Sequence, residues 1–192
     1  MRIADATAAS SASGQGAAGS IIVSGSRVTL AAGGRLDATT AADGAGGRID
    51  VTASESIDIV GTGAASLATG VLTRTAGAGA AGDIALSAPS VNIVDGGIVS
   101  ASSDAEASGA AGSVRVRAGR FAIAGPAPSR VESSTGGTGS GGDVSIVATD
   151  VTIGAGGLVA ASSSGAGVAG QVTIVAADAL RIFGGCLLYT SD

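Results

Sequence analysis

The sequence predicts an all-β fold, a parallel β-helix of about six coils with three short strands in each. First, a glycine before an alternating apolar run recurs at intervals of 28, 35, 30, 30 and 28 residues by subtraction. Second, the apolar residues after it fall into short period-2 runs separated by glycine-rich corners. Third, 34 glycines and 2% aromatics favour a core of small aliphatic columns, as in repeat proteins. The recurring glycines are Gly19, Gly47, Gly82, Gly112, Gly142 and Gly170.

The stretch 142–161 shows the elements of one repeat in order. Val144 and Ile146 alternate with polar residues, which is typical of a strand with one buried face. A second run follows at 151–153, and the glycine-rich segment 154–157 predicts a corner. A third run at 158–161 then leads through serine and glycine to the next repeat. Each repeat is therefore expected to contribute three strands.

The other repeats carry equivalent apolar pairs. The first runs contain Ile21/Val23, Ile49/Val51, Ile84/Leu86, Val114/Val116, Val144/Ile146 and Val172/Ile174. The second runs contain Val28/Leu30, Ile57/Ile59, Val91/Ile93, Phe121/Ile123, Val151/Ile153 and Leu180/Ile182. The third runs contain Leu36/Ala38, Val99/Ala101, Val131/Ser133 and Val159/Ala161.

The third run of the second repeat is irregular. Leu72 is taken as its first inward residue, and Arg74 then falls where the other repeats have a small residue. Either a bulge turns Arg74 outward or this strand is displaced. Additional residues at 61–66 and at 125–128 are predicted to be loops at corners, because insertions are absorbed between strands and proline cannot donate to a ladder.

Composition and charge narrow the classes of function. The formal net charge is −5, with ten arginines and no lysine, and this balance does not favour a nucleic-acid partner. No apolar run approaches the roughly 18 residues of a membrane span, so no membrane insertion is expected. No secretory leader is visible in the chain. Histidine and lysine are both absent, which removes the usual catalytic bases and the Schiff-base nucleophile.

Several acidic residues could be taken for sites. Gly82-Asp83 and Gly142-Asp143 are similar to calcium-binding β-roll turns, but no second acidic ligand recurs at a fixed spacing, and turn aspartates are expected. A second group alternates with inward residues and is expected on a solvated face, although paired carboxylates could also serve a glycosidase or lyase. Its members are Asp37, Asp50, Glu55 and Asp58.

No catalytic, cofactor-binding or metal-ligating residue is predicted, and no cofactor. The Gly-x-Gly run at 77–79 is not followed by a helical pattern, so it does not indicate a phosphate site. Thr29, Asn92 and Thr152 share an outward position on the second strand. We interpret them as a solubilising column, because threonine recurs too irregularly for an ice- or polysaccharide-binding face.

The pattern GGDVSIVATDVTIGAGGLVAASSSGAGVAGQVTI resembles the repeats of filamentous haemagglutinin-like, two-partner-secreted exoproteins of Gram-negative bacteria. The resemblance covers about residues 19–183. It implies a right-handed β-helix that is secreted or at the cell surface, a structural or adhesive role, and export by an outer-membrane secretion partner. For such an adhesive fibre segment we expect a host-cell or glycan receptor, with residues 102–109 and 133–141 as the contact loops.

The alternative is a fragment of a pectin-lyase-like β-helix enzyme that acts on carbohydrate. Such an enzyme needs a groove lined by clustered acids and basic side chains. Convergence of Arg48, Asp50 and Asp58 in a cleft would favour it.

Both ends of the chain look cut, so residues 1–185 are expected to be a β-helix region truncated at each end. Residues 186–192, CLLYTSD, leave the repeat pattern and resemble the translation of a sequencing-library transposon adapter. We expect this tail, with the only cysteine, to be non-native. Genomic codons at this position would contradict that expectation.

Overall fold

The protein is built from two parallel β-sheets that wind together as a solenoid. The computed structural model describes residues 1–192 except 5, 42, 64–67, 185–186 and 192. The described residues contain no helix, and therefore none that could cross a membrane. The strands are β1 (Arg2–Ala4), β2 (Thr7–Ala12), β3 (Ile21–Ala31), β4 (Arg35–Thr40), β5 (Ile49–Val60), β6 (Thr69–Thr75), β7 (Ile84–Val94), β8 (Gly97–Ser103), β9 (Val114–Ala124), β10 (Ser129–Thr135), β11 (Val144–Ile153), β12 (Gly157–Ser163), β13 (Val172–Ile182) and β14 (Leu187–Ser191).

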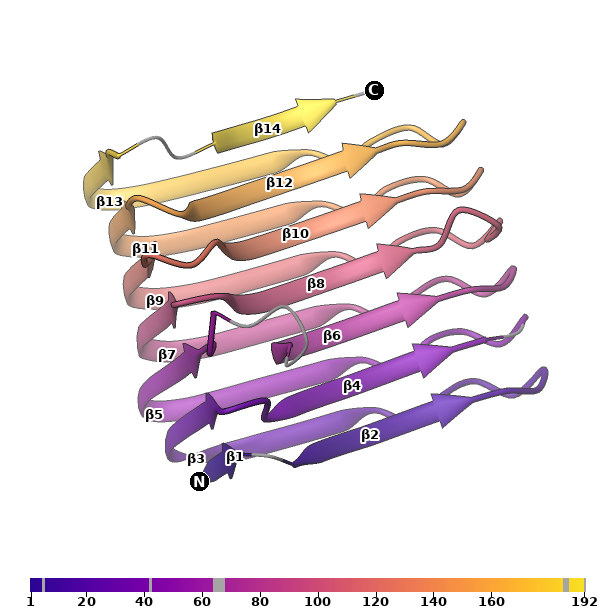
Figure 1. The fold of residues 1–192 in the computed structure, drawn as a ribbon, viewed down its shortest axis with the longest axis horizontal. Helices are drawn as coiled ribbons and strands as arrows, with labels where there is room; N and C mark the ends of the chain where they lie inside the picture. Colours follow the sequence, from indigo (N-terminus) through magenta and orange to yellow (C-terminus); the bar gives the residue numbers. More distant parts are fainter. Residues whose placement is uncertain (5, 42, 64–67, 185–186, 192) are drawn as a thin grey trace.

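Odd- and even-numbered strands lie in different sheets. One seven-stranded sheet has the order β1-β3-β5-β7-β9-β11-β13, and the other runs β14-β12-β10-β8-β6-β4-β2. Each long strand and the short strand after it make one coil, so coils 1 to 6 begin at β3, β5, β7, β9, β11 and β13. Figure 1 shows these coils stacked from one end of the molecule to the other. The predicted all-β parallel solenoid of about six turns is confirmed.

The predicted apolar pairs stack on one another. Val144 pairs with Val114 below it and Val172 above it. Val151 pairs in the same way with Phe121 and Leu180. Stacked equivalents place like side chains at the spacing of parallel strands, about 4.8 Å, so the core is a set of continuous aliphatic columns.

The first two predicted runs are joined in one long strand. In β7 the inward positions are Ile84, Leu86 and Ala88, then Val91 and Ile93, with Pro89 and Ser90 both outside the core. The change of phase at this point makes a corner without a turn. Strand register shifts at the equivalent place in other coils, for example between Thr52 and Ser56. Each coil therefore has three inward-facing runs carried on two strands.

The predicted alignment of the second repeat is wrong by one residue. Leu36 pairs with Val71, not Leu72, and the buried residue two positions on is Thr73. Strand β6 pairs with β4 and β8 without a register shift, so Arg74 points outward because the strand is displaced, not bulged. A pattern based on apolar residues favours Leu72 over the polar Thr73. A buried threonine is stable here because its hydroxyl donates to the carbonyl of Gly82 at 2.5 Å.

The short strands carry a column of small residues, in which Ala38, Ala101 and Ala161 are fully buried. Substituting phenylalanine for Ala161 is expected to overpack this column and destabilise the protein by about 1–3 kcal/mol. Urea unfolding followed by circular dichroism measures the change. The same substitution at the exposed Ala105 is the control, and equal effects would contradict close packing at Ala161.

Two columns of glycine form the corner where a short strand leads into the next long strand. A Cβ on Gly112 would stand 2.0 Å from the carbonyl oxygen of Gly82 in the coil below. A Cβ on Gly139 would stand 2.2 Å from that of Gly109. Contacts under 3 Å are not possible for a side chain, so these glycines are required by the close approach of stacked backbones. The columns are Gly47, Gly82, Gly112, Gly142 and Gly170, and Gly44, Gly79, Gly109, Gly139 and Gly167.

A column of hydroxyl groups at the ends of the short strands holds these corners closed. Thr135, at the end of β10, donates its hydroxyl to the carbonyl of Gly139 at 2.8 Å. The equivalent donors are stacked in register through coils 1 to 5. Each donor satisfies a carbonyl of the corner segment inside the fold, and the sequence analysis did not predict this. The pairs are Thr40–Gly44, Thr75–Gly79, Ser103–Gly109, Thr135–Gly139 and Ser163–Gly167.

Replacing Thr135 by valine is expected to destabilise the protein by about 1–3 kcal/mol, because the buried Gly139 carbonyl loses its donor. Valine keeps the shape of threonine, so packing changes little. Ser134 is adjacent to Thr135 but is not fully buried, so Ser134→Ala is the control. Urea midpoints that agree for the two variants would show that the hydroxyl column contributes nothing.

The last coil of the long-strand sheet has an unpaired edge. Leu180 and Ile182 on β13 are 49% and 45% exposed, whereas Val151 and Ile153 beneath them are fully buried. An open edge and uncovered aliphatic side chains favour association. The 192-residue chain on its own is expected to self-associate or to fray at its terminal coils. Sedimentation as a sharp monomer, with uniformly slow amide exchange from Ile21 to Ile182, would contradict this.

The tail expected to be non-native extends the other sheet. Strand β14 pairs in parallel with β12, with Leu187 opposite Leu158. Backbone ladders use groups that almost every residue supplies, so a strand can form here whatever the origin of its sequence. The non-native origin of 186–192 stays a prediction.

Candidate functional site

The corner between long and short strands differs most among the coils. In coil 3, β7 and β8 are joined by Asp95 and Gly96 alone. In coil 2 the connection spans 61–68, and in coil 4 it spans 125–128. The proline-containing segment is therefore a corner loop, as predicted. Of the other predicted insertion, 61–63 lie at the corner and 64–66 lie outside the described residues.

The short turn of coil 3 depends on left-handed backbone. Asp95 has a φ of 55° and Gly96 a φ of 90°. Glycine adopts this region freely, and aspartate tolerates it better than most residues. This turn is shorter than the corner loops of coils 2 and 4 on either side of it. The difference in loop length therefore leaves a depression over the turn.

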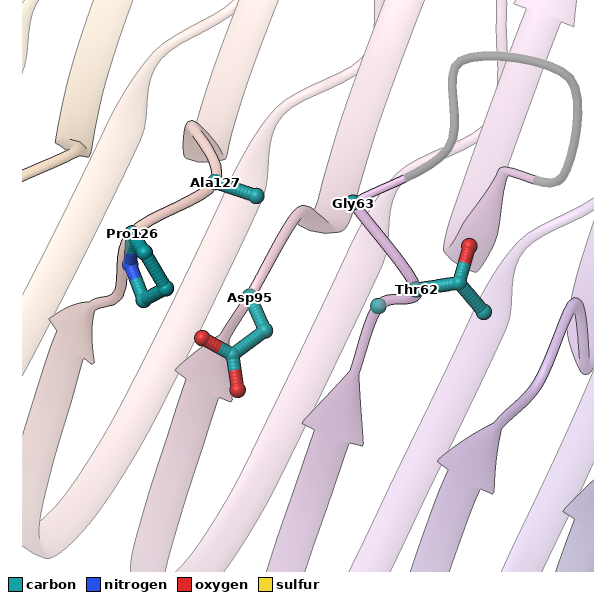
Figure 2. A pocket seen from close by; sticks show the side chains of 6 residues that line it. Thr62, Gly63, Asp95, Pro126 and Ala127 are labelled. Carbon is teal, nitrogen blue, oxygen red and sulfur yellow. The ribbon is translucent and has the colours of Figure 1, made fainter.

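The two longer loops approach each other around this turn. Gly63 donates its N–H to the carbonyl of Asp95 at 3.1 Å, and a Cβ placed on Gly63 would lie 3.4 Å from that of Ala127. Figure 2 shows Asp95 between Pro126 and Ala127 on one side and Thr62 and Gly63 on the other. The result is an open pocket of about 500 Å³, which we call the corner pocket; it is lined by Gly61, Thr62, Gly63, Asp95, Pro126 and Ala127.

The corner pocket offers one charged acceptor beside an apolar wall. The Asp95 carboxylate is half-buried and accepts no hydrogen bond from the described residues. Its Oδ1 would be 2.6 Å from a Cβ on Gly125, so glycine is required there for the carboxylate to take this position. A carboxylate and a proline ring suit a ligand with hydroxyl or amino donors and an apolar face.

The segment 104–113 is the second candidate contact region. It connects β8 to β9 with ten residues, whereas the equivalent segments 76–83 and 136–143 have eight. Arg74 holds its start through two hydrogen bonds to the Asp104 carboxylate, 2.5 Å from Nε and 2.6 Å from Nη2. The Asp104 hydrogen bond raises the pKa of Arg74.

Within this segment Ala107 and Gly109 are buried, while Ala105, Glu106 and Ser108 are exposed. The predicted contact loop 102–109 therefore begins inside β8 and exposes mainly its middle. The other predicted loop, 133–141, begins inside β10 and exposes Thr138 and Ser140. Figure 1 shows both segments at the edge where short strands end.

The acidic residues considered as catalytic carboxylates have separate partners. Asp50 accepts a hydrogen bond from Arg48 at 2.8 Å near the start of β5. Near its end, Asp58 accepts from Ser56 and Asn92, each at 2.7 Å. The structure therefore brings Arg48 and Asp50 together, whereas Asp58 has other partners. The lyase alternative stays a prediction. Asp37 contacts Arg35 and Thr39, and Glu55 pairs with Arg27.

The two turn aspartates bind the backbone of the coil above. Asp83 Oδ1 accepts the N–H of Ser113, and Asp143 Oδ1 accepts the N–H of Gln171, both at 2.8 Å. These carboxylates link consecutive coils. In the described part of the chain, no three His, Cys, Asp or Glu residues gather in a way that could hold a metal ion.

The outward column on the second run is mixed. Thr29, Asn92 and Thr152 occupy equivalent positions, as predicted, but Asp58, Ala122 and Arg181 share the same column. The surface is therefore not a flat threonine array.

No protein-family model matches the chain, and neither a curated protein nor a solved structure matches it significantly. The resemblance to filamentous haemagglutinin-like exoproteins stays a prediction.

Proposed function

We propose that the chain is a structural and adhesive repeat segment of a large secreted or surface-attached bacterial fibre protein. One observation carries the structural part: coils 1 to 6 stack strand on strand through two seven-stranded parallel sheets. Because each coil repeats the same inward columns, coils can be added without changing the contacts of those already present. Such a stack is suited to span a distance.

The adhesive part of the proposal is supported by the differences among the coils at the protein surface. The inward residues and the corner glycines pack between coils and are not available to a partner. Loop length and exposed side chains, in contrast, differ from coil to coil. Differences of this kind concentrate at the corner pocket and at 104–113. A host-cell or glycan receptor is the proposed partner of these regions. Export to the surface by an outer-membrane secretion partner is part of the same proposal.

Adhesion of beads coated with the 192-residue chain, measured on host cells and on a glycan array, tests the proposal. Binding above albumin-coated beads is the expected result. Glu106→Ala with Ser108→Ala should lower it if 104–113 makes contact, whereas Ser24→Ala with Ser26→Ala, on the exposed face of β3, is the matched control. Absence of binding in both assays would overturn the adhesive role and leave only the structural one.

A further inference from the structure

Strand β9 presents three arginines on the outer face of the long-strand sheet. Arg115 is held by Asp83, with Nη1 3.1 Å from Oδ2. Arg117 and Arg120 are exposed and form no ion pair with any described residue. Two unpaired guanidinium groups three residues apart are notable in a chain whose net charge is −5.

The neighbouring strands leave this positive charge largely uncompensated. Arg117 lies in register between Ser87 on β7 and Val147 on β11. Arg120 lies between Ser90 and Asp150, but the ion pair of Asp150 is with Arg181, at 3.8 Å. Asp83 is engaged by Arg115, Asp143 accepts the N–H of Gln171, and Asp178 is on β13, two strands away from β9.

A notch opens beside Arg120, and Arg117 lies three residues away on the same strand, outside the notch lining. Its floor is Gly119, where a Cβ would stand only 2.9 Å from the carbonyl oxygen of Pro89. The notch has a volume of about 290 Å³, and it is lined by Pro89, Ser90, Gly119, Arg120, Thr149 and Asp150. It therefore combines a guanidinium, two hydroxyls, a proline ring and the Asp150 carboxylate on three neighbouring strands, β7, β9 and β11.

We propose that Arg117, Arg120 and this notch bind an oxyanion, sulfate or carboxylate, that is carried by a saccharide. The planar guanidinium donates pairs of N–H groups that match the oxygens of such an anion. The hydroxyls of Ser90 and Thr149 can bond to sugar hydroxyls, and the Pro89 ring can cover an apolar sugar face.

A densely charged polymer fits this surface less well. Nucleic acid carries a charge every 1.7 Å or so, and Asp150 and the net negative charge of the chain oppose it. A saccharide with isolated anionic groups places one charge at the arginine pair and neutral hydroxyls around it. The site lies on the coil face, away from the corner pocket and 104–113, and does not depend on the proposed adhesive role.

An NMR titration of the full chain tests the site, following the Gly119 amide and the Nε–Hε groups of Arg117 and Arg120. The probes are N-acetylglucosamine 6-sulfate, galacturonate, neutral N-acetylglucosamine, inorganic sulfate and a single-stranded oligonucleotide. At low ionic strength the two anionic sugars should shift these signals and the neutral sugar should not. Added salt should weaken the response.

Arg117→Gln with Arg120→Gln should reduce the affinity about tenfold, the loss expected for charge-assisted hydrogen bonds at a partly exposed site. Arg27→Gln is the matched control, because Arg27 occupies the same outward column as Arg120 but is paired with Glu55. Unchanged affinity in the double variant, or silence of Gly119, would overturn the proposal. Inorganic sulfate or the oligonucleotide binding as tightly as the anionic sugars would overturn the assignment to a saccharide.

Discussion

Substituting valine for Gly112 is expected to destabilise the protein by about 4 kcal/mol or more, a loss reached only when packing itself is broken. A Cβ at this position would stand 2.0 Å from the carbonyl oxygen of Gly82 and 2.6 Å from its carbon. Neither backbone can retreat, because the Val114 N–H beside it is bonded to Asp143 in the coil above and the Ile84 N–H beside Gly82 is bonded to Ser113. Urea unfolding followed by circular dichroism, together with the soluble yield, measures the effect.

Gly25→Val is the matched control for this substitution. Gly25 is exposed on β3, and the nearest atom to an added Cβ is 3.8 Å away. Its urea midpoint is expected to stay close to that of the parent chain. If Gly112→Val does not fold, the smaller Gly112→Ala supplies a measurable midpoint. A midpoint for Gly112→Ala equal to that of Gly25→Ala would show that the corners can relax, against the close approach seen here.

The sequence predicts the corner glycines and the apolar columns because both depend on local periodicity. Val144, Val114 and Val172 share one column in the prediction and in the structure. The reason for glycine at these positions is a contact between distant residues, because a Cβ on Gly112 would meet the carbonyl of Gly82, 30 positions earlier in the chain. The backbone conformation does not require glycine at position 112, because Gly112 does not have a positive φ, whereas Gly156 does.

Buried hydroxyls are the part of the fold that apolar periodicity does not predict. Thr73 and Thr135 are polar residue types, so the sequence pattern favours Leu72 over Thr73 and places Thr135 in a contact loop. Each is fully buried or nearly so and donates to a backbone carbonyl of a corner. A pattern of apolar residues cannot reveal an acceptor contributed by a glycine elsewhere in the coil.

The candidate sites were less predictable than the fold. The corner insertion around Pro126 was visible in the sequence, but the pocket arises because Ala127 and Gly63 approach each other around the turn at Asp95. The alternation of β9 shows that Arg117 faces outward. That its neighbours are Ser87 and Val147, with no carboxylate, follows only from the register of three coils.

Replacing Phe121 by alanine is expected to destabilise the protein by about 3–5 kcal/mol. Phe121 is fully buried in coil 4 between Val91 and Val151. Loss of the ring leaves a cavity in a continuous column, and stacked backbones that are hydrogen-bonded on both sides cannot close it. The only other phenylalanine, Phe183, is 57% exposed, so Phe183→Ala is a matched control that should cost less than about 1 kcal/mol.

The position of Phe121 also predicts how the variant unfolds. In a solenoid each coil contacts only its neighbours, and β9 is the sole link in its sheet between β7 and β11. A weakened coil 4 should therefore uncouple coils 1–3 from coils 5–6, and the urea transition should broaden or divide in two, with protected amides remaining on one side of the break. A single sharp transition, shifted no further than that of Phe183→Ala, would show that stability is not passed from coil to coil through this column.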